Sequence, residues 1–387
     1  MDSIVGQIRS LAESADAVGR NQILNTLRDL QYDLETPMDT YMKFVNSNIQ
    51  LAMVYVGVEL GLFKELVKAE EKTLTLDDLV KQSSASPDLL ERILRYLSST
   101  GLMLNVGPNQ FQANRITHLL ADPLADAGIC YAFDAYGPAV QACPSFLAET
   151  HYRDFAVDNK ASFQKGHNTE LGSFQWMINH PKLFNGLQKM MTALQSSNWV
   201  VGFDLLDQEA RTVQRDDSPT LEKPFLVDVG GGHGHQCKQL LEKYPNLHGS
   251  IVLQDLPQAV EGLPPMDGVR AMAQDFFEKQ TIKGAKFYYL RRIFHDWGDA
   301  DCLKILKNLA VAMNSNSRIL IDEVILPDVN AHWQAAVGDI SMGIMIGGKE
   351  RTKRQWEALI AQSGLRLSHI HSYNAIQCNS VIVLELQ

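Results

Sequence analysis

Residues 226–235, Leu-Val-Asp-Val-Gly-Gly-Gly-His-Gly-His, join an apolar run to a helical pattern through a turn rich in glycine. Glycines in such a turn let a ligand approach the backbone, and the first N–H groups of the following helix can bind a polar group. The dinucleotide fingerprint G-x-G-x-x-G does not fit, because its third glycine would fall on His235 or Cys237. The spacing that fits is acid-x-G-x-G-x-G, carried by Asp228, Gly230, Gly232 and Gly234. We therefore expect a nucleoside-type ligand without a pyrophosphate.

Acidic side chains also end the next two predicted strands. Asp255 lies 21 residues after Gly234, at a strand end where a carboxylate can accept hydrogen bonds from both hydroxyls of a ribose. Asp275 stands beside Phe276 after the third strand, and a carboxylate next to an aromatic ring suits the amino edge and the face of adenine. Asp255 alone could be a strand-end cap, but the three strand ends together predict a nucleoside site.

From residue 225 onward, apolar runs alternate with helical patterns, which is typical of a parallel sheet of β-α units. The connection between the last two strands is too short for a parallel pair, so they must form an antiparallel hairpin. We predict an α/β fold with a mostly parallel, Rossmann-like, seven-stranded sheet. The predicted strands are 225–229, 249–254, 269–273, 285–290, 318–323, 365–373 and 380–386, and the predicted helices are 235–243, 299–313 and 352–363.

The N-terminal third is predicted to be helical and to contain a winged helix. Apolar residues at helical spacing cover 1–35 and 41–68, with interruptions near Gly57 and Gly61. Residues 74–115 then follow the order helix, turn, helix, hairpin. DNA binding is one interpretation of that order, but the segment holds four acids and four bases and so lacks a basic face. We prefer a structural or dimerisation module.

The middle of the chain separates these two patterns. Residues 120–200 look helical, and the apolar stripe at 171–195 suits a core or, since methionine adapts to irregular shapes, the wall of an apolar pocket. Residues 207–223 are polar and have no apolar period, so we expect a surface loop or linker there.

Composition narrows the class of protein. The 387 residues carry 45 acids and 35 bases, a formal net charge of −10, which argues against a protein built to bind nucleic acid. No apolar run approaches the roughly 20 residues that span a bilayer, and no secretory signal is visible at the start. The five cysteines match neither a zinc site nor a disulfide framework, so we expect reduced thiols in a cytoplasmic protein.

A histidine follows the fourth predicted strand, in a Phe-His-Asp-Trp sequence. Ligands of open α/β sheets bind outside the carboxyl ends of the strands, so His295 is expected beside the nucleoside site, where it can act as a general base. Glu323, at the end of the next strand, could orient its ring as the acid of a triad does, and Glu350 is a second candidate. His233 and His235 lack a third ligand and do not predict a metal site.

Five stretches together resemble the fungal branch of the S-adenosylmethionine-dependent O-methyltransferases, relatives of the plant caffeic-acid type. They are Asp-Val-Gly-Gly-Gly-His-Gly, Gln-Asp-Leu-Pro, Tyr-Tyr-Leu-Arg-Arg-Ile-Phe-His-Asp-Trp, Ile-Asp-Glu-Val-Ile-Leu-Pro and Gly-Gly-Lys-Glu-Arg-Thr. The similarity runs from about residue 35 to the end of the chain. It implies a class I methyltransferase fold, S-adenosylmethionine as cofactor and no metal. It also implies an intertwined homodimer, with a winged-helix dimerisation domain at 1–120 and a catalytic domain at 121–387, in which 120–200 close the pocket and 225–387 form the sheet.

The resemblance assigns roles to individual residues. The glycines at 230–232 would contact the methionine part of the cofactor, Asp255 the ribose, and Asp275 with Phe276 the adenine. The full expected cofactor set is Asp228, Gly230, Gly231, Gly232, Asp255, Leu256, Asp275, Phe276, Arg291 and Arg292, and the expected catalytic set is His295, Asp296, Glu323 and Glu350.

The sequence departs from the plant pattern around the proposed site and in one loop. Arg291 stands where a lysine is usual, so a basic group is kept, whereas Arg292 replaces a tryptophan that usually stacks beside the cofactor. Glu350 is a few residues off its usual distance. The polar stretch at 207–223 is longer than in the plant enzymes.

These expectations converge on methyl transfer to a phenol or enol hydroxyl of a small aromatic or polyketide-type secondary metabolite, with His295 as the general base. Members of the group have also been recruited to pericyclic steps, with the cofactor kept as a bound cation. In such a cyclase or dehydratase, His295, Arg292 and Asp296 could polarise a carbonyl. The intact His-Asp-Trp sequence favours methyl transfer over such a reaction. A noncatalytic binder is a third hypothesis, but it would need a loss of cofactor affinity or a basic face like that of a DNA-binding protein, and neither is seen in the sequence.

Overall fold

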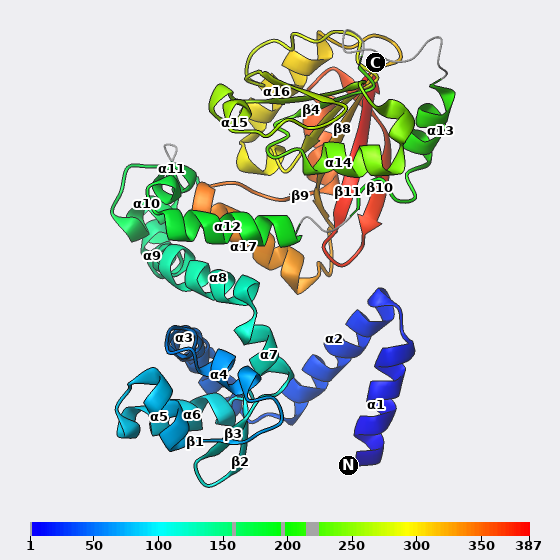
Figure 1. Ribbon diagram of the computed structural model, residues 1–387. Coiled ribbons are helices and arrows are strands. Elements are labelled where there is room, and N and C mark those ends of the chain that lie inside the picture. Colours follow the sequence, from blue (N-terminus) through cyan, green and yellow to red (C-terminus); the bar gives the residue numbers. More distant parts are fainter. Residues whose placement is uncertain (1, 157–159, 195–197, 214–223) are drawn as a thin grey trace. The chain divides into compact units, whose positions relative to one another are not determined.

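The computed structural model describes residues 2–156, 160–194, 198–213 and 224–387 (Figure 1). The chain divides into two compact units. The first contains residues 1–15, 19–149 and 162–196, and the second contains 16–18, 150–161 and 197–387.

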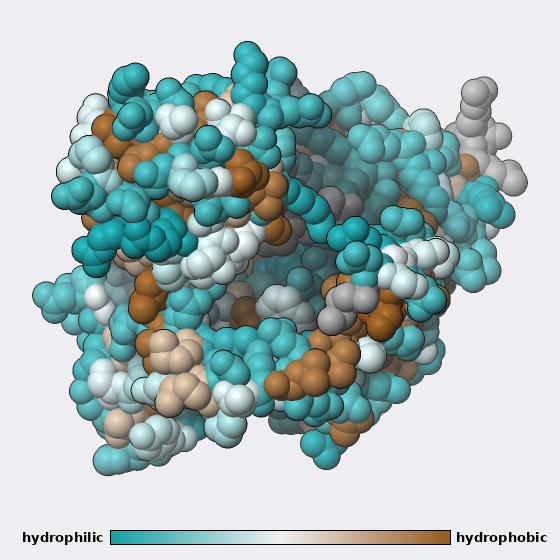
Figure 2. All heavy atoms as spheres, turned by 90° about the horizontal axis from the view of Figure 1, so that it is seen from below, coloured by the Kyte–Doolittle hydropathy of each residue, from teal (hydrophilic) through white to brown (hydrophobic). Residues whose placement is uncertain are grey.

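The chain begins with helices α1 (Asp2–Ser14) and α2 (Ala17–Leu34), where the sequence predicted a single helix. Neither helix has a buried residue, and large apolar side chains such as Leu24 and Leu34 are exposed. Figure 2 shows apolar side chains lying among polar ones on the face seen from below.

Helices α3 (Pro37–Glu59) and α4 (Leu62–Lys68) follow, and Gly61, with φ +68°, separates them as predicted. The predicted interruption at Gly57 was wrong, since Gly57 lies inside α3. A Cβ there would come within 2.8 Å of the Phe63 ring, so the glycine serves close packing and does not end the helix.

The winged-helix pattern is present in the first unit. Thr75 and Asp78 form a capping box that starts α5 (Leu76–Ser83), and α6 (Pro87–Ser99) buries one apolar face. The strands β1 (Leu74–Thr75), β2 (Leu104–Gly107) and β3 (Gln110–Gln112) form a small antiparallel sheet in the order β1-β3-β2.

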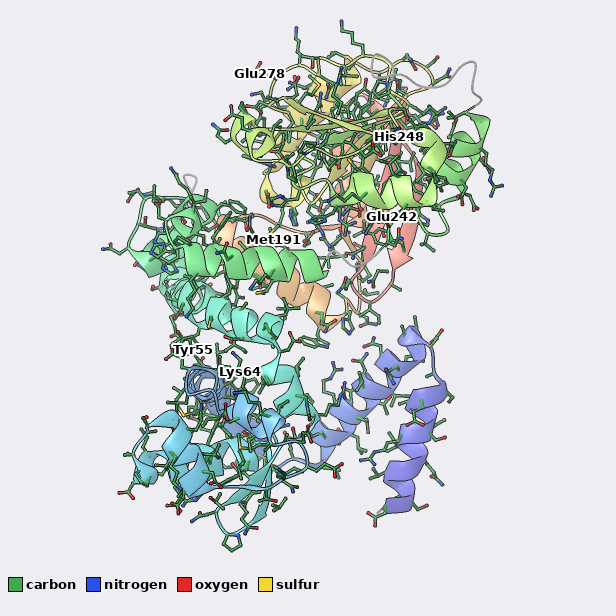
Figure 3. All side chains as sticks on the ribbon, in the orientation of Figure 1. Tyr55, Lys64, Met191, Glu242, His248 and Glu278 are labelled. Carbon is green, nitrogen blue, oxygen red and sulfur yellow. The ribbon has the colours of Figure 1, made fainter. Side chains whose placement is uncertain are left out.

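The middle of the chain is helical, as expected. It comprises α7 (Arg115–Ala121), α8 (Pro123–Tyr131), the π-helix η1 (Ala132–Tyr136), α9 (Gly137–Glu149), α10 (Ser162–His167), α11 (Ser173–Ile178) and α12 (Pro181–Leu194). Tyr55 of α3 (Figure 3) stacks on Phe133 of η1 at 4.7 Å between ring centroids, and its hydroxyl donates to Asp134 at 2.9 Å. These helices therefore group with the first unit, although we predicted that they belong with the catalytic domain; the functional boundary at residue 120 stays a prediction.

The second unit holds the predicted α/β sheet. Its strands are β4 (Leu226–Val229), β5 (Ile251–Asp255), β6 (Val269–Ala273), β7 (Phe287–Arg291), β8 (Arg318–Leu326), β9 (Arg351–Thr352), β10 (Leu365–Asn374) and β11 (Asn379–Leu386). They lie in the order β10-β11-β8-β7-β4-β5-β6, and the short β9 pairs with β8. The pairs from β8 to β6 are parallel, and β11 is antiparallel to both β8 and β10, which confirms the predicted hairpin.

Helices cover both faces of this sheet. One core cluster packs α16 (Asp299–Ala310) and α18 (Lys353–Ala361) against it, and the other packs α13 (Asp204–Thr212) and α14 (His235–Lys243). The other helical elements of this unit are η2 (Pro245–Leu247), α15 (Pro257–Glu261), η3 (Phe294–Asp296) and α17 (Trp333–Ile346). Chain order reverses between β4 and β7, and open α/β sheets bind ligands at the carboxyl ends of strands beside such a reversal.

The predicted polar loop at 207–223 was wrong in its first part. Residues 207–212 belong to α13, which buries Leu206 and Ala210, and residues 214–223 lie outside the described part of the chain. All five cysteines are free thiols. Among the described helices, none combines the length and the apolar character that a bilayer crossing requires.

Candidate active site

The glycine turn between β4 and α14 is closely packed on its inner side and open on its outer side. A Cβ at Gly231 would lie 2.8 Å from the carboxyl group of Asp228, so no larger residue fits. Gly232 has φ +52° and would meet no atom within 4 Å if it carried a Cβ. A ligand can therefore approach the backbone at Gly232, as the sequence analysis expected.

Asp228 lies under this turn and is fully buried. Burial raises the pKa of its carboxyl group to about 7, and its Oδ2 accepts a hydrogen bond from Sγ of Cys237 at 3.2 Å. Asp228 thus supports the turn from below. Its predicted role as a cofactor contact stays a prediction.

Asp255 is oriented by the backbone around it. Its Oδ2 accepts from the N–H of Gly232 at 2.9 Å and its Oδ1 from the N–H of Leu256 at 2.7 Å. The carboxylate at the end of β5 is therefore fixed directly beside the glycine turn.

Aromatic rings line the next strand end. Asp275 accepts from the N–H of Phe277 at 2.8 Å, which orders the segment after β6. Phe276 approaches the turn, since its ring would lie 3.8 Å from a Cβ at Gly230. The structure therefore brings together the three strand ends that the sequence predicted to form a nucleoside site.

Arg291 is buried at the end of β7. Its Nη1 lies 3.2 Å from Asp322 and 3.2 Å from Gln236. Asp322 also accepts from the hydroxyls of Tyr289 and Tyr373, at 2.5 and 2.6 Å. Nε of Arg291 and Nε2 of Gln236 are buried and have no hydrogen-bond partner among the described residues, so both donors are available to a bound polar group.

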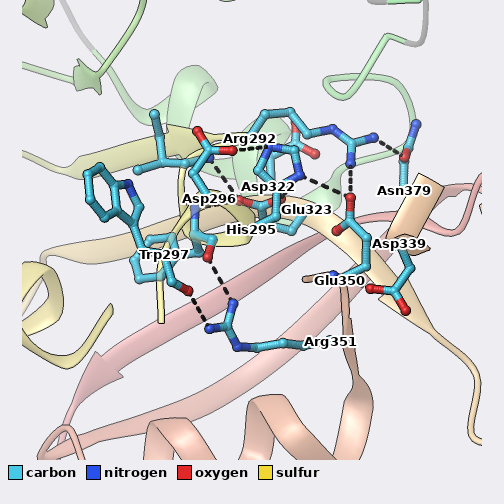
Figure 4. Close-up of polar contacts among 12 residues, drawn as sticks. Arg292, His295, Asp296, Trp297, Asp322, Glu323, Asp339, Glu350, Arg351 and Asn379 are labelled. Carbon is cyan, nitrogen blue, oxygen red and sulfur yellow. Dashed lines mark hydrogen bonds and ion pairs between the residues drawn. The ribbon is translucent and has the colours of Figure 1, made fainter. Parts of the chain in front are cut away.

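Three carboxylates surround the imidazole of His295 (Figure 4). Nδ1 lies 3.0 Å from Oε1 of Glu350 and 3.8 Å from Oε2 of Glu323, and Nε2 lies 3.3 Å from Oδ1 of Asp296. The structure thus assembles the four predicted catalytic residues. The sequence analysis placed Glu323 first and Glu350 second as the acid that orients the ring. In the structure, Glu350 is the hydrogen-bond partner of the ring and Glu323 is not.

Glu323 has another task that explains this difference. Its Oε1 accepts from the backbone N–H groups of Ile293 and Phe294, at 2.9 and 2.8 Å. The carboxylate therefore caps the short turn η3 that carries His295, and only its second oxygen faces the ring.

These charges set the protonation of the ring. Burial of His295 disfavours the imidazolium, but Glu323, Glu350 and Asp296 outweigh it and raise the pKa of His295 to about 9. Burial also raises the pKa of Glu323 above its usual range. In the protein without a ligand, the ring is therefore mostly cationic at neutral pH.

The backbone around His295 is held by residues 348–351, a role that the sequence analysis did not predict for them. Lys349 N–H donates to His295 O at 2.9 Å, and a Cβ at Gly348 would lie 2.2 Å from that same oxygen. The buried guanidinium of Arg351 donates to Phe294 O at 2.9 Å and to Trp297 O at 2.8 Å. Close backbone approach and a buried arginine thus position the catalytic turn.

His295, Glu323 and Glu350 have donor atoms within 4.8 Å of one another, a spacing that could also hold a metal ion. The 3.0 Å contact between His295 and Glu350 is a normal hydrogen bond and needs no ion to explain it. That the site uses no metal stays a prediction.

A mostly parallel sheet with an antiparallel C-terminal hairpin, a glycine turn and an acid at the end of the second strand define a class I methyltransferase. Family comparisons agree: residues 160–366 match the O-methyltransferase domain and residues 42–122 the O-methyltransferase dimerisation domain. The demethylsterigmatocystin 6-O-methyltransferase of Aspergillus flavus is 37% identical over 375 residues, which are 97% of this chain and 95% of that protein. The chain belongs to the S-adenosylmethionine-dependent O-methyltransferase family.

Two solved structures share the whole fold. The structure of LepI in complex with SAM has a TM-score of 0.87 and 36% identity, and the match covers 100% of this chain and 98% of that one. A structure described as "A Pericyclic Reaction enzyme" has the same TM-score and identity, with 100% and 99% covered. The relatives therefore include both chemistries that the sequence analysis considered.

Proposed function

We propose that this enzyme transfers a methyl group from S-adenosylmethionine to a phenol or enol hydroxyl of a small aromatic or polyketide-type metabolite. The observation that carries the proposal is the position of His295 in η3, which follows β7 directly, with its ring fixed by Glu350. Ile293 of the same segment packs against the glycine turn after the paired strand β4, since a Cβ at Gly230 would lie 2.6 Å from its side chain. Relatives named for the methylation of demethylsterigmatocystin support this class of acceptor.

The residues around the glycine turn fit the proposed cofactor. The open side of Gly232 gives space for the methionine part, and the oriented carboxylate of Asp255 suits the ribose hydroxyls. Phe276 offers a ring face for the adenine, with Leu256 and Asp275 nearby. The unpaired donors of Arg291 and Gln236 suit a carboxylate.

S-Adenosylmethionine supplies, when bound, a methyl group on a positively charged sulfur. His295 accepts the hydroxyl proton of the acceptor at Nε2, while its Nδ1–H donates to Glu350. Glu323 and Asp296 stabilise the imidazolium that forms. Asp296 lies 3.3 Å from Nε2, and its side chain is partly exposed.

We further propose that the enzyme acts as a homodimer in the cytoplasm. The dimerisation domain at 42–122 supports the dimer. The exposed apolar side chains of α1 to α3 give it a surface to bury. We propose no nucleic-acid partner for the winged helix, because its segment has no excess of basic residues.

A pericyclic or dehydrating activity is the second candidate, favoured by the similarity to a pericyclic enzyme. In that reading, Arg292, His295 and Asp296 would polarise a carbonyl and the cofactor would not be consumed. Demethylsterigmatocystin and a panel of phenols, incubated with methyl-labelled S-adenosylmethionine, separate the two. Label in the product supports methyl transfer, whereas a changed product without label supports the second candidate.

A further inference from the structure

Arg292 has a conformation that directs it into the acid cluster. It is the first residue after β7, its φ is +55°, and its N–H donates to Asp322 O at 3.1 Å. Its Nη1 lies 3.4 Å from Oε1 of Glu350, and its Nη2 donates to Oδ1 of Asn379 at 2.7 Å (Figure 4). The guanidinium is therefore held from two sides, by an acid and by the start of β11.

Two cations share one carboxylate oxygen. Oε1 of Glu350 is the atom that contacts both Nδ1 of His295, at 3.0 Å, and Nη1 of Arg292, at 3.4 Å. A positive charge next to a carboxylate weakens the attraction of that carboxylate for a second positive charge. Arg292 thus reduces the stabilisation that Glu350 gives to a charged imidazole.

Few positive charges contact the acids around the ring. Three carboxylates, Glu323, Glu350 and Asp296, face the His295 ring, and among the described residues only His295 and Arg292 form ion pairs with them. The other nearby charges are paired or lie further out: Asp299 pairs with Lys349 and Arg351, and Asp339 accepts from the N–H of Glu350.

We propose that Arg292 is a positioning residue for the reaction, the counter-charge that weakens the attraction of Glu350 for the imidazolium while Glu350 still orients the ring of His295. The inference rests on the proposed function for its catalytic meaning, since a general base must be able to lose its proton. It differs from the cofactor contact that the sequence predicted for this residue, and the two roles have different measurable consequences.

The test is an NMR titration of the His295 Cε1–H resonance, assigned by its absence in His295→Gln. In the unsubstituted protein the midpoint should lie near pH 9. Arg292→Gln and Arg292→Met remove the charge and keep the same backbone requirement, so the midpoint should rise by about one unit. Arg292→Lys should restore most of the original value.

Two further variants complete the test. Arg354→Gln removes an exposed arginine of α18 and should leave the midpoint unchanged. Asn379→Ser keeps Arg292 but removes the carbonyl that holds Nη2, so a smaller rise is expected; this variant serves if the Arg292 variants fold poorly. An unchanged or lower midpoint in Arg292→Gln or Arg292→Met would overturn the proposal.

Binding of S-adenosylhomocysteine, measured by calorimetry, separates the two roles. A counter-charge predicts unchanged affinity in Arg292→Gln, whereas weaker binding with an unchanged midpoint would make Arg292 a cofactor contact and overturn the proposal. Neither measurement needs the acceptor. A failure of methyl transfer in the labelled assay would therefore disprove the proposed function and leave the titration result unchanged.

Discussion

Nδ1 of His295 lies 3.0 Å from Oε1 of Glu350, a residue 55 positions further along the chain. The contact fixes which nitrogen carries the ring hydrogen, because a carboxylate can only accept. Nε2 is left as the nitrogen that can take a proton from an acceptor. The acids that surround the ring also raise the pKa of His295. The residue that must accept a proton is therefore mostly protonated at neutral pH.

Activity should increase steeply as the pH rises toward 9. Because the pKa of His295 is about 9 and the base must be neutral, kcat/KM should increase with pH and level off above that value. Initial rates at subsaturating acceptor between pH 6 and 10 measure this dependence. A rate independent of pH over that range would contradict the role of His295.

Replacing Asp296 by asparagine should move the pH dependence of kcat/KM to lower pH, whereas the Arg292 variants should move it to higher pH. Asp296 contacts Nε2 and raises the pKa of His295, so Asp296→Asn should lower the midpoint by about one unit. Asp301→Asn, at an exposed position of α16, is the matched control and should not move it. A midpoint that stays in place in Asp296→Asn would show that this carboxylate does not act on the ring.

A methyl group at residue 348 should disturb the catalytic turn. The Cβ of Gly348→Ala would lie 2.2 Å from His295 O, so the backbone of η3 must move, and we expect a loss of turnover of about 100-fold with cofactor binding retained. Gly338→Ala, in α17, meets no atom within 4 Å and should be active and slightly more stable. Equal activity of the two variants would exclude the positioning role of this segment.

The buried Asp228 should make stability depend on pH. Its pKa rises from 3.8 to about 7 on folding, so its contribution is complete below pH 3.8 and is lost as the pH rises toward 7. The loss amounts to about 4 kcal/mol over the whole range. The decrease in the free energy of unfolding between pH 5 and pH 8 should therefore be smaller in Asp228→Asn than in the unsubstituted protein, which urea unfolding of both would measure. The same decrease in both proteins would mean that Asp228 is already ionised at pH 5.

The sheet and the strand-end residues were predictable because their signals are local. Apolar runs, glycine spacing and acids at strand ends depend on neighbouring residues, and parallel topology then brings the strand ends together. The positions of Asp255, Asp275 and His295 at or shortly after their strands were predicted in this way, and their roles stay predictions. The helix α13 was missed because its apolar face is short, with Leu206 and Ala210 among polar residues.

The supporting residues were not predictable because they act across long distances in the chain. Arg351 binds the carbonyls of Phe294 and Trp297, and Asn379 binds Arg292 across 87 positions. Nothing in the spacing of these residues marks such contacts. The choice between Glu323 and Glu350 was also decided by tertiary structure, since the backbone of η3 occupies one oxygen of Glu323.

The most direct test of the account compares His295→Asn with the unsubstituted enzyme in the labelled methyl-transfer assay, with S-adenosylhomocysteine affinity measured on the same samples. We expect equal affinity and a rate of label transfer lower by about 100- to 10,000-fold in the variant. Label transfer by His295→Asn at nearly the rate of the unsubstituted enzyme would contradict the assignment of His295 as the general base.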